Sequence, residues 1–147
     1  MTDWDKRFID LAKHVAQWSK DPSTKVGAVI VDPKTKKVVS MGYNGFPRGV
    51  VDSDERYNNR EEKLSYIVHA EVNAVLNAGI PLNGYHIYVW PTMMIPNSCP
   101  ECSKVIAQSG ISMICCEEVN DLPERWQKLA KYSENILYEA GVKIKTI

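Results

Sequence analysis

YIVHAEVNAVLNAG, residues 66–79, is a mostly apolar run that ends in a glycine. Its apolar residues recur at the spacing of a helix, and a glycine such as Gly79 commonly lies just past a helix end. The sequence therefore predicts a helix from about Glu62 or later to Ala78. His69 and Glu71 lie near the start of this run, so two titratable side chains enter an otherwise apolar helix.

Strand and helix patterns alternate through the rest of the chain. Strands are expected at 26–32, 38–43, 86–90, 111–116 and 142–147. Further helices are expected from Thr2 to the Asp21-Pro22 stop signal, from Pro100 to just before Gly110, and from Leu122-Pro123 to about Ala140. This alternation predicts one α/β domain over residues 1–147, with three α/β/α layers and a central mixed, largely parallel five-stranded sheet. The polar segment from Asn44 to about Arg60 is expected to be a functional loop.

The composition is ordinary for a soluble domain and narrows the class of ligand. The 147 residues are 44% hydrophobic and 24% charged, and 18 basic residues balance 18 acidic ones. A net charge of zero argues against binding long nucleic acid, which usually needs a basic face, but it permits a small anionic ligand. No apolar run is long enough to span a membrane, and the first twenty residues lack an apolar signal core. We therefore expect a cytoplasmic protein with no membrane partner (in the host cell, if the source is a virus).

Two cysteines extend the pattern begun by His69. Cys99 and Cys102 lie at the start of the helix that follows the strand at 86–90, and helix starts of this kind sit at the carboxyl ends of strands, where α/β sheets bind ligands. Two thiolates and one imidazole make three zinc ligands, and a catalytic zinc keeps its fourth position for water. The other candidate ligands are expected to be structural: Cys115, Cys116, His14 and His86.

His69-Ala70-Glu71 followed by Cys99-Pro100-Glu101-Cys102 is the signature of the zinc nucleobase and nucleoside deaminases. Together with KVGAVIVD (25–32), GYNGFPRG (42–49) and AGVKIK (140–145), these residues resemble the deoxycytidylate (dCMP) deaminases, and the phage and bacterial members more than the animal ones. The resemblance covers essentially the whole chain. Ser98 stands where the signature has proline, which predicts a differently shaped loop before Cys99.

The resemblance implies a cytidine-deaminase-like fold and the hydrolytic deamination of dCMP to dUMP and ammonia, a source of dUMP for thymidylate synthesis. One catalytic Zn²⁺ per chain would be held by His69, Cys99 and Cys102. In the family the glutamate is not a ligand. It takes a proton from the zinc-activated water and passes it to the pyrimidine ring nitrogen, which would be the role of Glu71 here.

The family's substrate contacts can also be carried over by position. Asn44 would bind the deoxyribose 3′-hydroxyl, and the backbone N–H of Ala70 would reach the pyrimidine carbonyl. The phosphate would be held by the segment before the first strand and by the start of the last helix, at Ser23, Thr24, Lys25, Arg125 and Trp126.

Regulation is a further expectation from the resemblance. Many family members are homohexamers that dCTP activates and dTTP inhibits, with Mg²⁺ on the effector nucleotide. Their effector site is built around the GYNGFPRG loop and the polar segment after it. The corresponding residues here are Gly45, Phe46, Arg48, Gly49, Asp52, Glu55 and Arg56.

Two alternatives remain open at this point. The chain could be another zinc deaminase, acting on cytidine, cytosine, guanine or tRNA adenosine, although its neutral charge argues against tRNA and the GYNGFPRG loop against free bases. It could instead be a non-enzymatic zinc module that binds partners. A structural zinc site normally recruits a fourth protein ligand, whereas only three are evident here.

Overall fold

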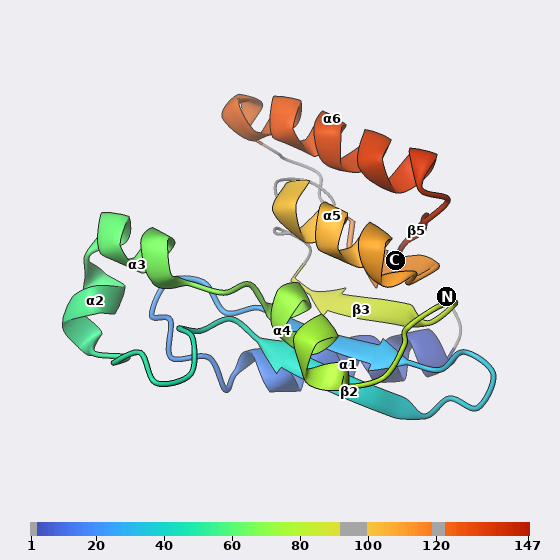
Figure 1. The fold of residues 1–147 in the computed structure, drawn as a ribbon, viewed down its shortest axis with the longest axis horizontal. Helices are drawn as coiled ribbons and strands as arrows, with labels where there is room; N and C mark the ends of the chain where they lie inside the picture. Colours follow the sequence, from blue (N-terminus) through green and yellow to red (C-terminus); the bar gives the residue numbers. More distant parts are fainter. Residues whose placement is uncertain (1–2, 92–99, 119–122) are drawn as a thin grey trace.

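The computed structural model describes residues 3–91, 100–118 and 123–147, and its five strands form one sheet in the order β2-β1-β3-β4-β5 (Figure 1). The strands are β1 (Gly27–Val31), β2 (Val38–Tyr43), β3 (His86–Trp90), β4 (Met113–Cys116) and β5 (Lys143–Thr146). The predicted mixed sheet is confirmed, but only half of the neighbouring pairs are parallel. β1 runs antiparallel to both β2 and β3, whereas β3, β4 and β5 are parallel.

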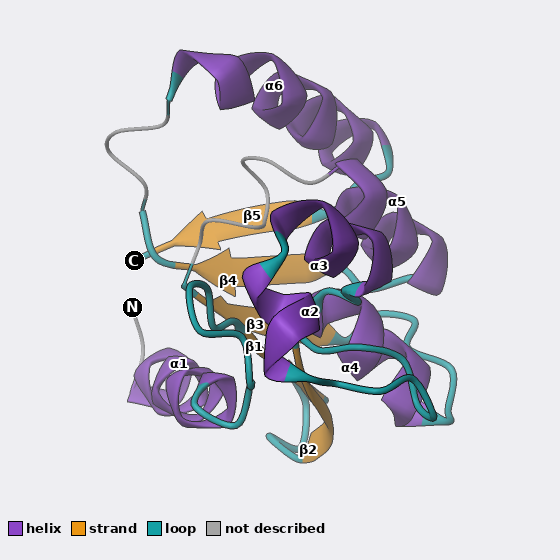
Figure 2. Ribbon diagram, turned by 90° about the vertical axis from the view of Figure 1, so that its left-hand side faces the viewer, coloured by secondary structure: helices purple, strands orange, loops and turns teal. Residues whose placement is uncertain are grey.

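The helices cover both faces of this sheet (Figure 2). They are α1 (Asp3–Ala16), α2 (Asp54–Asn58), α3 (Arg60–Tyr66), α4 (Ala70–Ala78), α5 (Pro100–Ser109) and α6 (Glu124–Glu139). α1 packs on one face, α4 and α5 lie on the other, and α6 packs against α5. Among the described residues, no helix is both long and apolar enough to cross a membrane.

β1 is buried along its whole length and serves both layers. Ala28 and Ile30 face the cluster formed with α4 and α5, while Val29 and Val31 face α1. This is the two-residue alternation of a strand covered on both sides. Cys115 on β4 lies in the α1 layer and is fully buried, and burial raises the pKa of its thiol to about 11, as expected for a cysteine that acts as a small hydrophobic residue.

The helix predicted from about Glu62 or later to Ala78 ends at Ala78 as expected but begins only at Ala70, because the chain breaks between α3 and α4. Between them, Val68 forms a two-bond bridge with Gly45: the N–H of Val68 donates to the Gly45 carbonyl at 2.7 Å, and the N–H of Gly45 donates to the Val68 carbonyl at 3.1 Å. These bonds require extended backbone, and His69 keeps a ψ of 152° as the N-cap of α4. The pairing with a distant segment therefore overrides the helical periodicity.

The strand register brings the ends of several segments together. Gly27, the first residue of β1, pairs with Tyr43 at the end of β2 and with Trp90 at the end of β3. The residues just before β1, just after β2 and just after β3 therefore meet at one end of the sheet. α2 and α3 lie beyond this same end (Figure 1).

Two glycines let helices approach the sheet at backbone distance. A Cβ atom on Gly27 would lie 2.0 Å from the Ala12 carbonyl oxygen of α1. A Cβ atom on Gly42 would lie 2.4 Å from the backbone nitrogen of Ala74 and 2.5 Å from the carbonyl oxygen of Ala70, both on α4. The position of α4 relative to β2 therefore depends on the missing side chain of Gly42.

We predict that Gly42→Ala destabilises the protein, because the added methyl group collides with α4 backbone that cannot move aside alone. Overpacking of this kind costs about 1–3 kcal/mol or more of unfolding free energy. Urea denaturation followed by circular dichroism measures it. Gly45→Ala is the matched control, since its Cβ would meet only the Tyr57 hydroxyl, at 3.9 Å. Equal unfolding midpoints for the two variants would contradict the close-approach argument.

Candidate active site

His69 and Cys102 come together at the starts of two helices, and Glu71 follows His69 by two residues. His69 Nδ1 lies 2.9 Å from Cys102 Sγ, although the two residues are 33 positions apart in the chain. Glu71 lies in the first turn of α4 and is 0% exposed. The structure thus gathers an imidazole, a thiol and a buried carboxyl group on the α4 and α5 side of the sheet.

Local backbone geometry explains why these side chains converge. His69 is the N-cap of α4, but its side chain makes no capping hydrogen bond. Glu71 follows in the first turn, and Cys102 lies in the first turn of α5. Backbone N–H groups at a helix start have no acceptor inside the helix and favour negative charge nearby. Both helix starts are therefore suited to a thiolate or a carboxylate.

The donor set at this position fits a zinc ion. Imidazole nitrogen and cysteine sulfur are usual protein ligands of Zn²⁺. Cys99 lies outside the described residues. Within the described ranges, no group of three or more potential metal ligands is found.

Asn44 is buried at the end of the sheet where β1 begins and where β2 and β3 end, and 5% of its surface is exposed. Its Oδ1 accepts a hydrogen bond from the N–H of Val26 at 2.9 Å, and its Nδ2 donates to the Thr24 carbonyl at 2.9 Å. An amide oxygen has two lone pairs, so Oδ1 keeps capacity for one further donor. The side chain is thus held firmly and can still accept a hydrogen bond from a ligand hydroxyl.

The segment before β1 contains Ser23, Thr24 and Lys25, which the sequence analysis assigned to a phosphate. The ammonium group of Lys25 donates a hydrogen bond to the Ser19 carbonyl. The cation beside Ser23 is a different one: Lys63 Nζ on α3 donates to Ser23 Oγ at 2.8 Å. No sequence motif points to Lys63, which the fold brings to Ser23 from 40 positions away.

Asp21 is the second residue that the sequence analysis missed. Its carboxylate is 1% exposed and accepts hydrogen bonds from the backbone N–H groups of Ser23 at 2.9 Å and Thr24 at 3.2 Å. Burial alone would raise the pKa of Asp21, but hydrogen bonds from Ser23, Lys63 and Thr24 hold that pKa below its ordinary value. An aspartate before proline and serine is a turn signal that could have drawn attention to it.

Two other predicted substrate positions lie at helix starts. Ala70 is the first residue of α4, so its backbone N–H is one of those without an acceptor inside the helix. Trp126 is half-buried in the first turn of α6, where its backbone N–H donates to the Pro123 carbonyl at 2.8 Å. Arg125 lies beside it in α6, but its side chain is not among those described.

The predicted effector segment is anchored by aromatic stacking. The Phe46 ring stacks on Tyr57 with 4.2 Å between ring centroids, and it meets the Tyr66 ring edge-on at 5.8 Å. Arg56 lies over the Tyr66 ring at 4.9 Å and pairs with Glu62 at 3.0 Å. This clustering connects the loop after β2 to α2 and α3.

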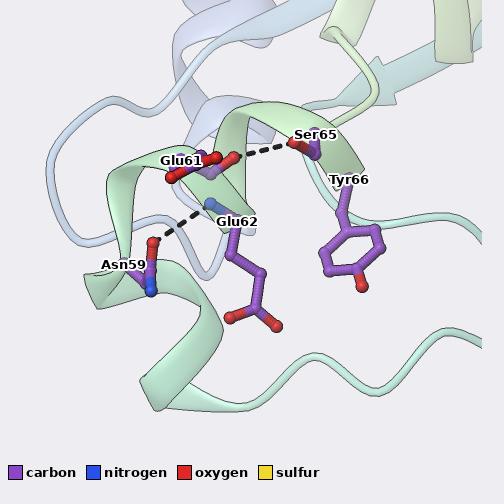
Figure 3. A pocket seen from close by; sticks show the side chains of 5 residues that line it. All are labelled: Asn59, Glu61, Glu62, Ser65 and Tyr66. Atoms are coloured by element: carbon purple, nitrogen blue, oxygen red, sulfur yellow. Dashed lines mark hydrogen bonds between the residues drawn. The ribbon is translucent and has the colours of Figure 1, made fainter.

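The remaining predicted effector residues lie on the surface. Arg48 Nη2 donates to Asn77 Oδ1 at 3.3 Å, and Asp52 pairs with Lys20 at 2.7 Å. Gly49 has a φ of 82° and Glu55 is exposed. A pocket of about 260 Å³ adjoins this segment, and Figure 3 shows its lining of Asn59, Glu61, Glu62, Ser65 and Tyr66.

Comparison with known proteins places this geometry in a family. The family described as "cytidine and deoxycytidylate deaminase zinc-binding region" matches residues 2–118. A deaminase of unassigned substrate, encoded in the luxG 3′ region of Aliivibrio fischeri, is 42% identical over 145 residues, covering 98% of this chain and 93% of that protein. A probable deoxycytidylate deaminase of Drosophila melanogaster is 41% identical over 122 residues, covering 76% of this chain. The match spans 57% of the length of the Drosophila protein.

Solved structures support the same fold. The dCMP deaminase of the cyanophage S-TIM5, in complex with dCMP and dUMP, matches with a TM-score of 0.73 at 22% identity, covering 100% of this chain and 99% of that one. The family match covers most of the chain and includes His69, Glu71, Cys99 and Cys102. The chain therefore belongs to the zinc-binding cytidine and deoxycytidylate deaminase family.

Proposed function

We propose that this protein is a single-domain dCMP deaminase, which hydrolyses dCMP to dUMP and ammonia. The observation that carries the proposal is the 2.9 Å approach of His69 Nδ1 to Cys102 Sγ, beside the fully buried Glu71, in a member of the deaminase family. Curated relatives named deoxycytidylate deaminase or probable deoxycytidylate deaminase support the choice of substrate.

In this proposal His69, Cys99 and Cys102 hold the zinc ion, which when bound supplies Lewis-acid activation of water. Glu71 is the general acid and base. Its carboxylate accepts a proton from the attacking water and delivers it to the pyrimidine ring nitrogen. It then accepts the remaining proton of the hydroxyl group added to the ring carbon and delivers that proton to the amino group, which departs as ammonia as the ring carbonyl forms. Burial of Glu71 serves this role because a carboxylate shielded from solvent exchanges its proton with the substrate rather than with bulk water.

The residues proposed to bind the nucleotide include the Asn44 side chain and the Ala70 backbone. Asn44 Oδ1 accepts a hydrogen bond from the deoxyribose 3′-hydroxyl, and the Ala70 N–H donates to the pyrimidine carbonyl. Polar groups before β1 and at the start of α6 hold the phosphate: Ser23, Thr24, Lys25, Arg125 and Trp126. Lys25 donates one hydrogen bond to the Ser19 carbonyl, and its ammonium group has two further donors for a phosphate.

The proposal extends to assembly and control, where the support is the family resemblance. A homohexamer, activation by dCTP, inhibition by dTTP and Mg²⁺ on the effector remain predictions, with the loop residues from Gly45 to Arg56 as the effector site. The stacked Phe46 and Tyr57 rings give this loop a rigid base. A cytoplasmic location is also retained as a prediction.

We predict that the protein deaminates dCMP at least about a hundredfold more efficiently than deoxycytidine, since a held phosphate adds two or more charge-assisted hydrogen bonds of roughly 1.5–3 kcal/mol each. The measurement is kcat/KM for dCMP, CMP, deoxycytidine, cytidine and guanine, each with and without dCTP and dTTP. Equal efficiency toward the nucleoside and the nucleotide would indicate a nucleoside deaminase, and turnover of guanine alone would reject the pyrimidine assignment.

We predict that Glu71→Gln keeps the fold and the bound zinc but loses at least about 10²–10⁴-fold in kcat, because an amide of the same shape cannot accept a proton. Steady-state turnover of dCMP measures the loss, and metal analysis measures the zinc. A Gln variant that works within about tenfold of the parent would remove Glu71 from the proton-transfer role, since such a loss is below that expected for a general base.

We predict that Cys102→Ala loses zinc, because removal of one of three protein ligands leaves too few to retain the ion. Cys115→Ala is the matched control: it also removes a fully buried thiol, but from β4 in the α1 layer. Zinc per chain, measured by atomic emission after dialysis against a chelator, should fall only in Cys102→Ala. Full zinc retention in that variant would reject the ligand set.

A further inference from the structure

An ion pair is buried between the segment before β1 and α3. Lys63 Nζ lies 2.9 Å from Asp21 Oδ2 and 3.0 Å from Asp21 Oδ1, and the two residues are 42 positions apart in the chain. Asp21 is 1% exposed and Lys63 is 9% exposed. This is a costly arrangement, because each charge must leave water, and an apolar pair of the same size is often no less stable. The contacts of the pair therefore suggest a role other than stability.

The Asp21 carboxylate sets the conformation of the proposed phosphate segment. Its Oδ1 accepts hydrogen bonds from the Ser23 N–H at 2.9 Å, the Ser23 hydroxyl at 3.0 Å and the Thr24 N–H at 3.2 Å. Its Oδ2 lies 3.4 Å from Asn44 Nδ2. One carboxylate thus contacts three of the residues that the proposed function assigns to the substrate.

Lys63 fixes the carboxylate and the serine at once. Its ammonium group donates to both oxygens of Asp21 and to Ser23 Oγ. α3, which carries Lys63, ends at Tyr66, shortly before the bridge of Val68 with Gly45 and the N-cap His69. The ion pair therefore connects the proposed phosphate segment to the chain that carries the proposed zinc ligand.

We propose that Asp21 and Lys63 are positioning residues for substrate choice. They hold the Ser23-Thr24 segment in the conformation that receives the nucleotide's phosphate, and without them the enzyme loses its preference for dCMP over deoxycytidine. This inference rests on the proposed function. Neither residue contacts the reacting atoms in this account, so their loss acts on binding of the phosphate rather than on the proton transfer at Glu71.

The test compares Lys63→Met with Lys145→Met in the full-length zinc-loaded protein. Lys145 is the matched control because it also pairs with a buried aspartate, Asp5, at 2.5 Å, and Asp5 accepts a hydrogen bond from the Tyr88 hydroxyl, which is not a proposed substrate residue. The measured quantity is the ratio of kcat/KM for dCMP to kcat/KM for deoxycytidine. Calorimetric affinities for dUMP and deoxyuridine give a second ratio that does not depend on turnover.

Lys63→Met should lower both ratios by about tenfold or more, with kcat for deoxycytidine and zinc content near parental values, because charge-assisted hydrogen bonds to a phosphate carry the preference. Lys145→Met should lower thermal stability and leave both ratios within about twofold of the parent, as expected for a distant, independent site. Parental ratios in Lys63→Met would overturn the inference and leave the proposed function standing. No preference for dCMP in the parent itself would overturn the proposed function, and this inference with it.

If Lys63→Met misfolds, a double variant tests the same inference. The single change leaves the buried Asp21 charge without its cation, whereas Asp21→Asn/Lys63→Met together remove both charges and keep an oxygen for the Ser23 and Thr24 N–H groups. This double variant should fold and should still show reduced ratios, because the serine loses its bond to Lys63. Parental ratios in the folded double variant would also overturn the inference.

Discussion

Two backbone hydrogen bonds between Gly45 and Val68 determine the arrangement of the candidate site. They hold the chain extended just before His69, so that α4 begins at Ala70 and His69 becomes its N-cap. In a continuous helix, His69 would lie inside the helix, and its backbone N–H and C=O groups would bond to other residues of that helix. Because the helix starts anew, the imidazole can meet Cys102 from α5, and Glu71 enters the core in the first turn.

The same bridge fixes the loop after β2 against the zinc-binding region. Asn44 precedes Gly45 directly, and its amide bonds to Val26 and Thr24 in the segment before β1. Three segments therefore meet at one point: the polar segment proposed to hold the phosphate, the Asn44 amide proposed to bind the sugar, and the chain that carries His69 and Glu71. The zero net charge of the chain conceals this local concentration of charged and polar groups.

Burial distinguishes the Asp21–Lys63 pair from the ion pairs on the surface. The Lys20–Asp52 and Lys104–Glu101 pairs lie on the surface, where solvent screens them and they contribute little. The Asp21–Lys63 pair is enclosed and joins distant segments. A second, partly buried network links α1 to β3 and β5, because Asp5 accepts hydrogen bonds from the Tyr88 hydroxyl at 2.8 Å and from the half-buried Lys145 at 2.5 Å.

The sequence by itself determined the strands, most of the helices and the family, because those depend on short-range patterns. Short apolar, β-rich runs, Gly79 and Gly110 at helix ends, and the His-x-Glu and Cys-x-x-Cys motifs can each be recognised within a few residues. Only the tertiary structure decided the break before His69, the antiparallel direction of β1 beside β3, and the pairing of Asp21 with Lys63. Each of these depends on a partner 23 or more residues away, as Gly45 is from Val68, and local propensity carries no information about such a partner.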